Sequence, residues 1–165
     1  MLAVCAACAM ASCDNTPIIE VDNAQHSIKE NMINANRVVA KSEETQIDGY
    51  LQRRGWQMQE LQCRARMRVY ESGKGMAIAN DDSVAVRYQL EALDGSIFYS
   101  NQIDTLVAGR QQVTIALDEA LLKMHYGDKA WVIAPSDCAY GVVGDGDRVG
   151  SRTVIVYNIL ECKRI

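Results

Sequence analysis

The side chains of this chain that could do chemistry are mainly aromatic and aliphatic. They lie in the C-terminal half, in Val84-Ala-Val-Arg-Tyr88, Asp94-Gly95, Phe98 and Ala139-Tyr140-Gly141. No member of this set is an obvious nucleophile, metal ligand or acid/base pair. Such residues can instead line an apolar pocket of defined shape. The chemistry open to them is therefore catalysis by shape and by exclusion of water.

Metal and disulfide chemistry are not expected from the remaining residues. His26 and His125 are the only histidines, and neither has a partner at a ligand spacing. Asp145-Gly-Asp147 lacks the spacing of a calcium-binding EF-hand, so an acidic loop tip is the simpler interpretation. Three cysteines lie beyond residue 13: Cys63, Cys138 and Cys162. Their irregular spacing fits neither a disulfide framework nor a zinc motif, so we expect free thiols. We expect no metal and no cofactor.

Length and charge limit the class of protein. The 165 residues suffice for one ordinary domain with an extension, and 48% of them are hydrophobic. The net charge is −4, and the Lys and Arg residues are scattered rather than gathered in one stripe. The local cluster Arg53–Arg68 is best explained as a helix end followed by the solvent face of a strand. A nucleic-acid partner is therefore not expected.

The first 13 residues have the character of an address. Met1–Ala11 is apolar and too short to span a bilayer, which is typical of a secretory signal peptide. Met10-Ala11-Ser12-Cys13 resembles a bacterial lipobox, which implies a lipid on Cys13 and a membrane-anchored protein facing the periplasm of the bacterial cell envelope. An ordinary cleaved signal and a disordered apolar tail are the alternatives. We predict a signal peptide over 1–13, a tether and helical extension over 14–61, and a folded domain over 62–165.

Helical patterns precede the folded domain. Pro17–Gln25 is polar and suits a short tether, and an approximate helical period follows from Ile28 to Val39. A second helix, ended by Gly55, places three apolar residues on one face: Ile47, Tyr50 and Leu51. The two stretches are either separate helices or one element broken near Lys41-Ser42. The three apolar residues either form a homodimer contact or pack onto the domain.

From Gln62 onward the apolar residues recur with the period of a β strand. We predict strands over 63–70, 84–90, 96–99, 130–134 and 153–160, a strand-like segment over 112–115 and a helix over 117–124. Asp94-Gly95 is a tight turn signal, and Gly127 follows the helix. About five antiparallel strands and one short helix predict an α+β domain whose sheet wraps that helix.

At these positions residues 66–162 resemble the FKBP-type peptidyl-prolyl isomerases. The family pattern corresponds to Val84-x-Val86-x-Tyr88, Asp94-Gly95, Phe98, Val113-Thr114, Met124-x-x-Gly127 and Ala139-Tyr140-Gly141. The resemblance implies the FKBP fold and isomerisation of X-Pro bonds without cofactor or metal. The helical extension and the lipobox-like end are further similar to lipoprotein FKBPs associated with gliding motility in Bacteroidetes-type bacteria.

The resemblance also assigns the pocket. The implied catalytic residues are aromatic: Tyr88, Phe98, Tyr140 and Tyr157. The implied substrate-binding residues surround them: Tyr99, Ile103, Val113, Thr114, Leu117 and Val149. Leu117 stands where many members carry Trp, and the backbone N–H of Thr114 is the group that binds ligand. Tyr99 departs from the pattern, because typical active members have Asp there.

Two functions of different classes follow. The first is a peptidyl-prolyl isomerase for exported, proline-containing polypeptides, in which an apolar pocket favours the twisted amide. The second is a non-catalytic binding, chaperone or assembly module with the same fold, tethered to the cell envelope. Tyr99 is the feature that favours the second.

Overall fold

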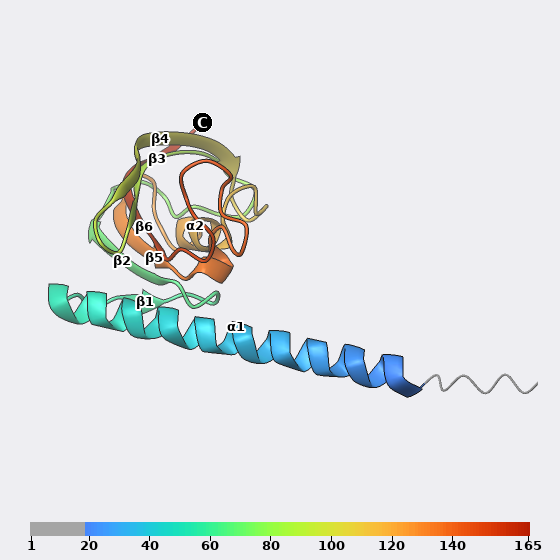
Figure 1. The fold of residues 1–165 in the computed structure, drawn as a ribbon. Helices are drawn as coiled ribbons and strands as arrows, with labels where there is room; N and C mark the ends of the chain where they lie inside the picture. The colour runs from blue at the N-terminus through green and yellow to red at the C-terminus, as the bar shows by residue number, and fades with distance from the viewer. Residues whose placement is uncertain (1–18) are drawn as a thin grey trace, which may run out of the picture. The chain divides into compact units, whose positions relative to one another are not determined.

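A six-stranded antiparallel sheet curves around one short helix (Figure 1). The computed structural model describes residues 19–165, with side chains from residue 25 onward. Its elements in chain order are α1 (Ile19–Arg54), β1 (Gln59–Glu60), β2 (Arg66–Glu71), β3 (Ser83–Ala92), β4 (Ile97–Val107), α2 (Ile115–Leu121), β5 (Lys129–Ala134), the 3-10 turn η1 (Ser136–Cys138) and β6 (Ile155–Arg164). Two compact units divide after Arg37, and the second holds the sheet. The predicted α+β fold class is confirmed.

The sheet places strands that are distant in sequence side by side. Its order is β1-β2-β5-β6-β3-β4, and every neighbouring pair is antiparallel. β3 and β6 form a long central pair, from Val84 opposite Arg164 to Ala92 opposite Ile155. Because β3 also pairs with β4 on its other edge, residues of β3, β4 and β6 are available to one site.

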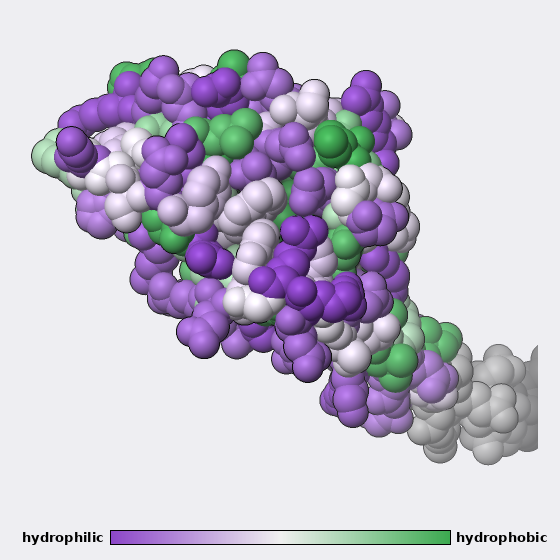
Figure 2. Space-filling view, turned by 90° about the vertical axis from the view of Figure 1, so that its left-hand side faces the viewer, coloured by the Kyte–Doolittle hydropathy of each residue, from purple (hydrophilic) through white to green (hydrophobic). Residues whose placement is uncertain are grey.

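Burial alternates along β3, as expected for a strand with one face on the core. Val84, Val86, Tyr88 and Leu90 are at most 3% exposed, whereas the residues between them are partly exposed. α2 supplies the opposite wall with Leu117 and Leu121, both fully buried. Each of these leucines contributes about 2 kcal/mol through removal of apolar surface from water. The face drawn in Figure 2 is mainly hydrophilic, with hydrophobic side chains scattered over it.

One predicted strand boundary and one predicted strand-like segment were wrong. The strand predicted over 96–99 continues as β4 to Val107, because its outer half pairs with β3 although it is polar. The strand-like segment predicted over 112–115 is not a strand. Thr114 has extended backbone angles, φ −61° and ψ 146°, but it is the N-cap of α2, and Ile115 begins the helix. Extended β-branched residues before a helix imitate a strand in sequence.

α1 is one continuous helix from Ile19 to Arg54, so there is no break near Lys41-Ser42 and residues 19–25 are helical. The polar residues at the expected break bond along the helix: Thr45 Oγ1 donates to the Lys41 carbonyl at 3.0 Å. The C-terminus of α1 matches the predicted helix end at Gly55. Gly55 has a φ of +63°, and the N–H of Trp56 reaches back to the Leu51 carbonyl at 3.1 Å. No helix within residues 19–165 is long and apolar enough to cross a membrane.

The last turns of α1 belong to the same unit as the sheet. Ile47 and Tyr50 are both 2% exposed and pack with Ile133, Val154 and Val156. Of the two alternatives for these residues, packing onto the domain is the arrangement found.

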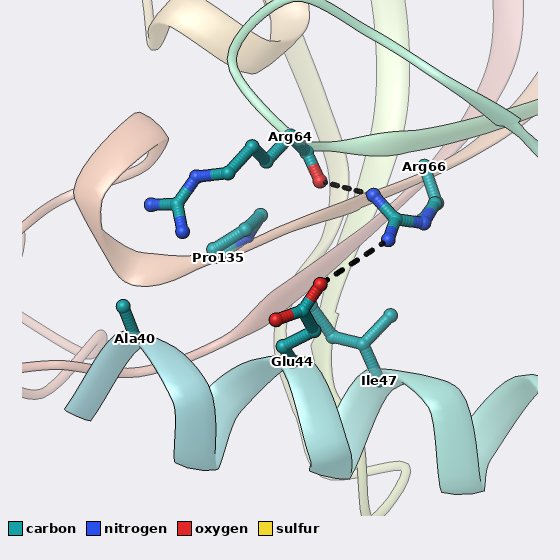
Figure 3. A pocket seen from close by; sticks show the side chains of 6 residues that line it. All are labelled: Ala40, Glu44, Ile47, Arg64, Arg66 and Pro135. Carbon is teal, nitrogen blue, oxygen red and sulfur yellow. Dashed lines mark hydrogen bonds and ion pairs between the residues drawn. The ribbon is translucent and has the colours of Figure 1, made fainter. Parts of the chain in front are cut away.

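A buried carboxylate adds a polar tie between α1 and the turn after β5. Glu43 is 4% exposed and accepts hydrogen bonds from Ser136, from its N–H at 2.9 Å and its Oγ at 2.6 Å. Figure 3 shows the neighbouring hollow, where Arg66 donates to the Arg64 carbonyl at 2.8 Å and lies 3.9 Å from Glu44. That hollow holds only about 10 Å³, the room of about one water, so it is no ligand site.

Candidate functional site

A cavity of about 410 Å³ opens beside the N-terminus of α2. It draws side chains from β3, β4, β6, α2 and the loops before α2 and after η1. Its lining consists of Tyr88, Asp104, Gln112, Val113, Thr114, Leu117, Ala139, Tyr140 and Tyr157. The cavity is large enough for a proline ring and the residues beside it, and three tyrosines line it.

The floor of the cavity is buried and closely packed. Leu117 is fully buried, and Tyr157 is 1% exposed. The ring of Tyr157 meets that of Tyr88 edge to face, with centroids 5.1 Å apart. Its hydroxyl and the Thr114 Oγ1 are hydrogen-bonded at 2.7 Å, which satisfies an otherwise buried polar group. The shape of the site is therefore fixed by side chains from β3, β6 and the N-cap of α2.

The tyrosine hydroxyls of the cavity stay protonated near neutral pH. Burial raises the pKa of Tyr88 far above its usual range, and the hydrogen bond to Asp104 raises it further. Burial likewise raises the pKa of Tyr140 and of Tyr157. The Tyr88 hydroxyl donates to Asp104 Oδ2 at 2.7 Å. The cavity thus offers neutral O–H donors rather than an anionic nucleophile.

Tyr99 ties β4 to the loop that carries Tyr140. Its hydroxyl donates to Asp145 Oδ2 at 2.6 Å, and this hydrogen bond is the main reason that the pKa of Tyr99 is raised to about 12. The other oxygen of Asp145 accepts three backbone N–H bonds, at 2.9, 2.9 and 2.8 Å, from residues 147–149. Arg148 lies with its guanidinium 5.2 Å from the Tyr99 ring centroid and donates to the Phe98 carbonyl at 2.9 Å.

The cavity unites six of the ten residues expected in the pocket: Tyr88, Val113, Thr114, Leu117, Tyr140 and Tyr157. The other four are not among the residues that line it. Phe98 and Tyr99 are partly buried against the core, and Val149 is 3% exposed within it. Ile103 is 60% exposed on the outer face of β4. Cys13, the expected lipidation site, lies outside the described residues.

Sequence reasoning missed Asp104, Gln112 and Ala139, which also line the cavity. For Asp104 a signal was present. Once β4 is extended to Val107, the alternation that buries Leu106 also turns Asp104 inward and Ile103 outward. Ile103, which the resemblance implied as a wall residue, lies on the outer face of the same strand.

Comparisons with known proteins agree with this geometry. Residues 74–160 match the profile of the FKBP-type peptidyl-prolyl cis-trans isomerases. The chain is similar to a probable FKBP-type peptidyl-prolyl cis-trans isomerase, FkpA, of Neisseria meningitidis serogroup B, with 27% identity over 94 residues. That match covers 56% of this chain and about a third, 35%, of the relative.

Solved structures extend the likeness to three dimensions. A peptidyl-prolyl cis-trans isomerase of Pseudomonas syringae pv. tomato has 30% sequence identity and a TM-score of 0.62, covering 78% of this chain and 92% of that one. The crystal structure of AtFKBP13 shares the fold, with a TM-score of 0.57 at 16% identity, over 64% of this chain and 97% of that chain.

Proposed function

This chain belongs to the FKBP-type peptidyl-prolyl cis-trans isomerase family, and we propose that it catalyses rotation about X-Pro bonds in the cavity beside α2. The observation that carries the proposal is the cavity itself. It combines a fully buried floor with three protonated tyrosines, which supports binding of a proline ring. Proline-containing polypeptides are the substrates.

The reaction needs a site that favours the twisted amide. Rotation about the C–N bond costs about 20 kcal/mol because amide resonance is lost. The twisted carbonyl is less polar than the planar one, so water stabilises it less. An apolar cavity withdraws the preferential hydration of the planar form, and its shape can fit the twisted form better. Leu117 and Tyr157 supply the apolar surface around the proline ring.

Tyr140 is the hydroxyl that we assign to the substrate. The Tyr88 hydroxyl donates to Asp104, and the Tyr157 hydroxyl is hydrogen-bonded to Thr114. A further hydrogen bond joins the Tyr157 and Tyr140 hydroxyls. It lowers the pKa of Tyr140 against the larger rise caused by burial, so Tyr157 acts as its donor and the O–H of Tyr140 stays available. Tyr140 lines the cavity from the loop after η1 and is only partly buried. Its protonated O–H can therefore donate to a substrate carbonyl during rotation, without any proton transfer.

A proline-peptide isomerisation assay tests the proposal. Tyr140→Phe removes one neutral hydrogen bond and keeps the ring, so kcat/KM should fall about five- to tenfold. Tyr70→Phe, on β2 and not among the residues that line the cavity, is the matched control and should leave the rate unchanged. A wild-type protein with no rate above buffer would contradict catalysis.

The alternative is a module that binds polypeptides without isomerising them. Tyr99 in place of the usual Asp favours it, as do Val142 and Val143, which are 62% and 87% exposed on the loop beyond Tyr140. If the protein is such a module, the wild type and the Tyr140→Phe variant should suppress the aggregation of an unfolded protein equally well. Suppression that is lost from a Val142→Ser, Val143→Ser variant would support this second function.

We place this activity at the bacterial cell envelope, on exported clients. The lipobox-like segment Met10–Cys13 supports a lipid anchor on Cys13. In a bacterial host, labelled palmitate should enter the wild-type protein, and Cys13→Ala should abolish the label and release the protein from the membrane fraction. A label that persists in Cys13→Ala would contradict the anchor.

A further inference from the structure

We propose that Asp104 makes the cavity selective for X-Pro bonds with a basic residue next to the proline. The proposal rests on the proposed isomerase function and names its preferred substrate class. Asp104 lies on β4, and its carboxylate is part of the cavity lining. It is the only acidic side chain among the nine described residues of that lining.

The carboxylate of Asp104 is held in place by neutral groups. Its Oδ2 accepts from the Tyr88 hydroxyl at 2.7 Å, and its Oδ1 accepts from Gln102 Nε2 at 3.1 Å. Both donors are uncharged, so they fix the geometry and leave the negative charge uncompensated. Within the described part of the chain, none of the ion pairs includes Asp104. A substrate cation can therefore provide the missing partner.

The surroundings of Tyr140 have the same sign. Burial is the main reason that its pKa is raised, and the charges of Asp145 and Asp104 both raise it further. One basic residue of this loop, Arg148, is engaged elsewhere. Arg148 lies over the Tyr99 ring, donates to the Phe98 carbonyl and has Asp147 at 3.7 Å. A peptide entering beside Tyr140 therefore meets the carboxylates of Asp104 and Asp145, which attract Lys or Arg and repel Asp or Glu.

The size of the effect follows from the half-exposed setting. Charge pairs that water reaches are screened, so the preference is modest and depends on salt. At low ionic strength we expect kcat/KM for Lys-Pro peptides to exceed that for norleucine-Pro peptides about threefold, and that for Glu-Pro peptides about tenfold. Norleucine has nearly the length of lysine without its charge, so it separates electrostatics from packing. Both ratios should shrink when salt is raised.

The experiment compares the three peptides with the full chain and two variants. Asp104→Asn keeps an oxygen acceptor for the Tyr88 hydroxyl and removes the charge, and its Lys-to-Glu ratio should fall close to one. Asp94→Asn makes the same change of net charge on the exposed turn after β3, and it should keep the wild-type ratio. The readout is the ratio of two kcat/KM values measured on the same variant. A general loss of activity lowers both values and leaves this ratio unchanged.

The outcomes separate selectivity from catalysis. Equal rates for all three wild-type peptides, or an unchanged ratio in Asp104→Asn, overturn the assignment of Asp104 and leave the isomerase proposal intact. If no peptide is turned over, the isomerase proposal fails, and the dissociation constants of the same peptides measured by calorimetry decide the selectivity. Tighter binding of the Lys peptide that Asp104→Asn removes supports the assignment, and equal binding overturns it.

Discussion

Tyr99 stands where the family resemblance implies an aspartate, and another residue of the same strand supplies a carboxylate to the Tyr88 hydroxyl. Asp104 lies five residues further along β4, and its carboxylate accepts a hydrogen bond from that hydroxyl at 2.7 Å. Tyr99 instead binds Asp145, whose other oxygen gathers three backbone N–H groups of the loop. Tyr88 therefore has its acidic partner on β4, and Tyr99 links β4 to the loop that carries Tyr140.

The role of Tyr99 can be tested by removing only its hydroxyl. Tyr99→Phe keeps the ring under Arg148 and breaks the bond to Asp145. We expect the backbone amides of residues 147–149 to exchange hydrogen faster, and kcat/KM to fall severalfold because Tyr140 is less well positioned. Hydrogen exchange read by mass spectrometry checks the first effect. Unchanged exchange in this loop would show that Tyr99 does not hold it.

Acid should loosen the same loop. Burial alone would raise the pKa of Asp145, but the hydrogen bonds from Tyr99 and from the backbone N–H groups outweigh it, so the pKa lies below its ordinary value of 3.8. A carboxyl whose pKa is lowered by folding adds stability above its unfolded pKa and loses it as the pH falls through the folded value. We therefore expect protection of the 147–149 amides to decline below pH 3.8 in the wild type, and Asp145→Asn to lack this acid-dependent decline.

Elements that bury one face were predictable from the sequence, and elements whose burial depends on a neighbour were not. Apolar or β-branched residues indicate β3, β5 and β6 in the sequence. The predicted limits of these strands differ from the observed ones by only a few residues. The outer half of β4 is an edge with exposed residues, so pairing with β3 decides its conformation. A strand predicted to end at residue 99 also leaves Asp104 out of the expected pocket. The tyrosines were found because the family pattern, rather than periodicity, marks them.

The last turns of α1 are expected to support the loop that begins at η1. Glu43→Ala leaves the N–H and Oγ of Ser136 without their buried acceptor, so the free energy of unfolding should fall by about 2 kcal/mol. Glu44→Ala is the neighbouring control: Glu44 is exposed and 3.9 Å from Arg66, so its loss should change stability by less than about 0.5 kcal/mol. Urea denaturation measures both, and equal effects would contradict a structural role of Glu43.

At the scale of the whole molecule, the packing of α1 bears on self-association. Ile47 and Tyr50 are used inside the sheet-bearing unit. Earlier in the helix, Ile28, Met32 and Ile33 are 59%, 62% and 48% exposed. Their spacing places them on one side of the helix, where water contact is unfavourable for apolar side chains. If the N-terminal helices form a homodimer, these residues are the ones that can supply its contact.

We therefore expect a concentration-dependent dimer that depends on the early part of α1 and not on the packed part. Ile28→Ser together with Met32→Ser should convert a dimer at micromolar concentration into a monomer in sedimentation velocity, with no change in the urea midpoint of the sheet-bearing unit. Val143→Ser, which removes an exposed apolar residue from the loop after Tyr140, is the matched control and should leave the dimer intact. A wild-type monomer at these concentrations would contradict the dimer, and a dimer that survives the double substitution would place its contact elsewhere.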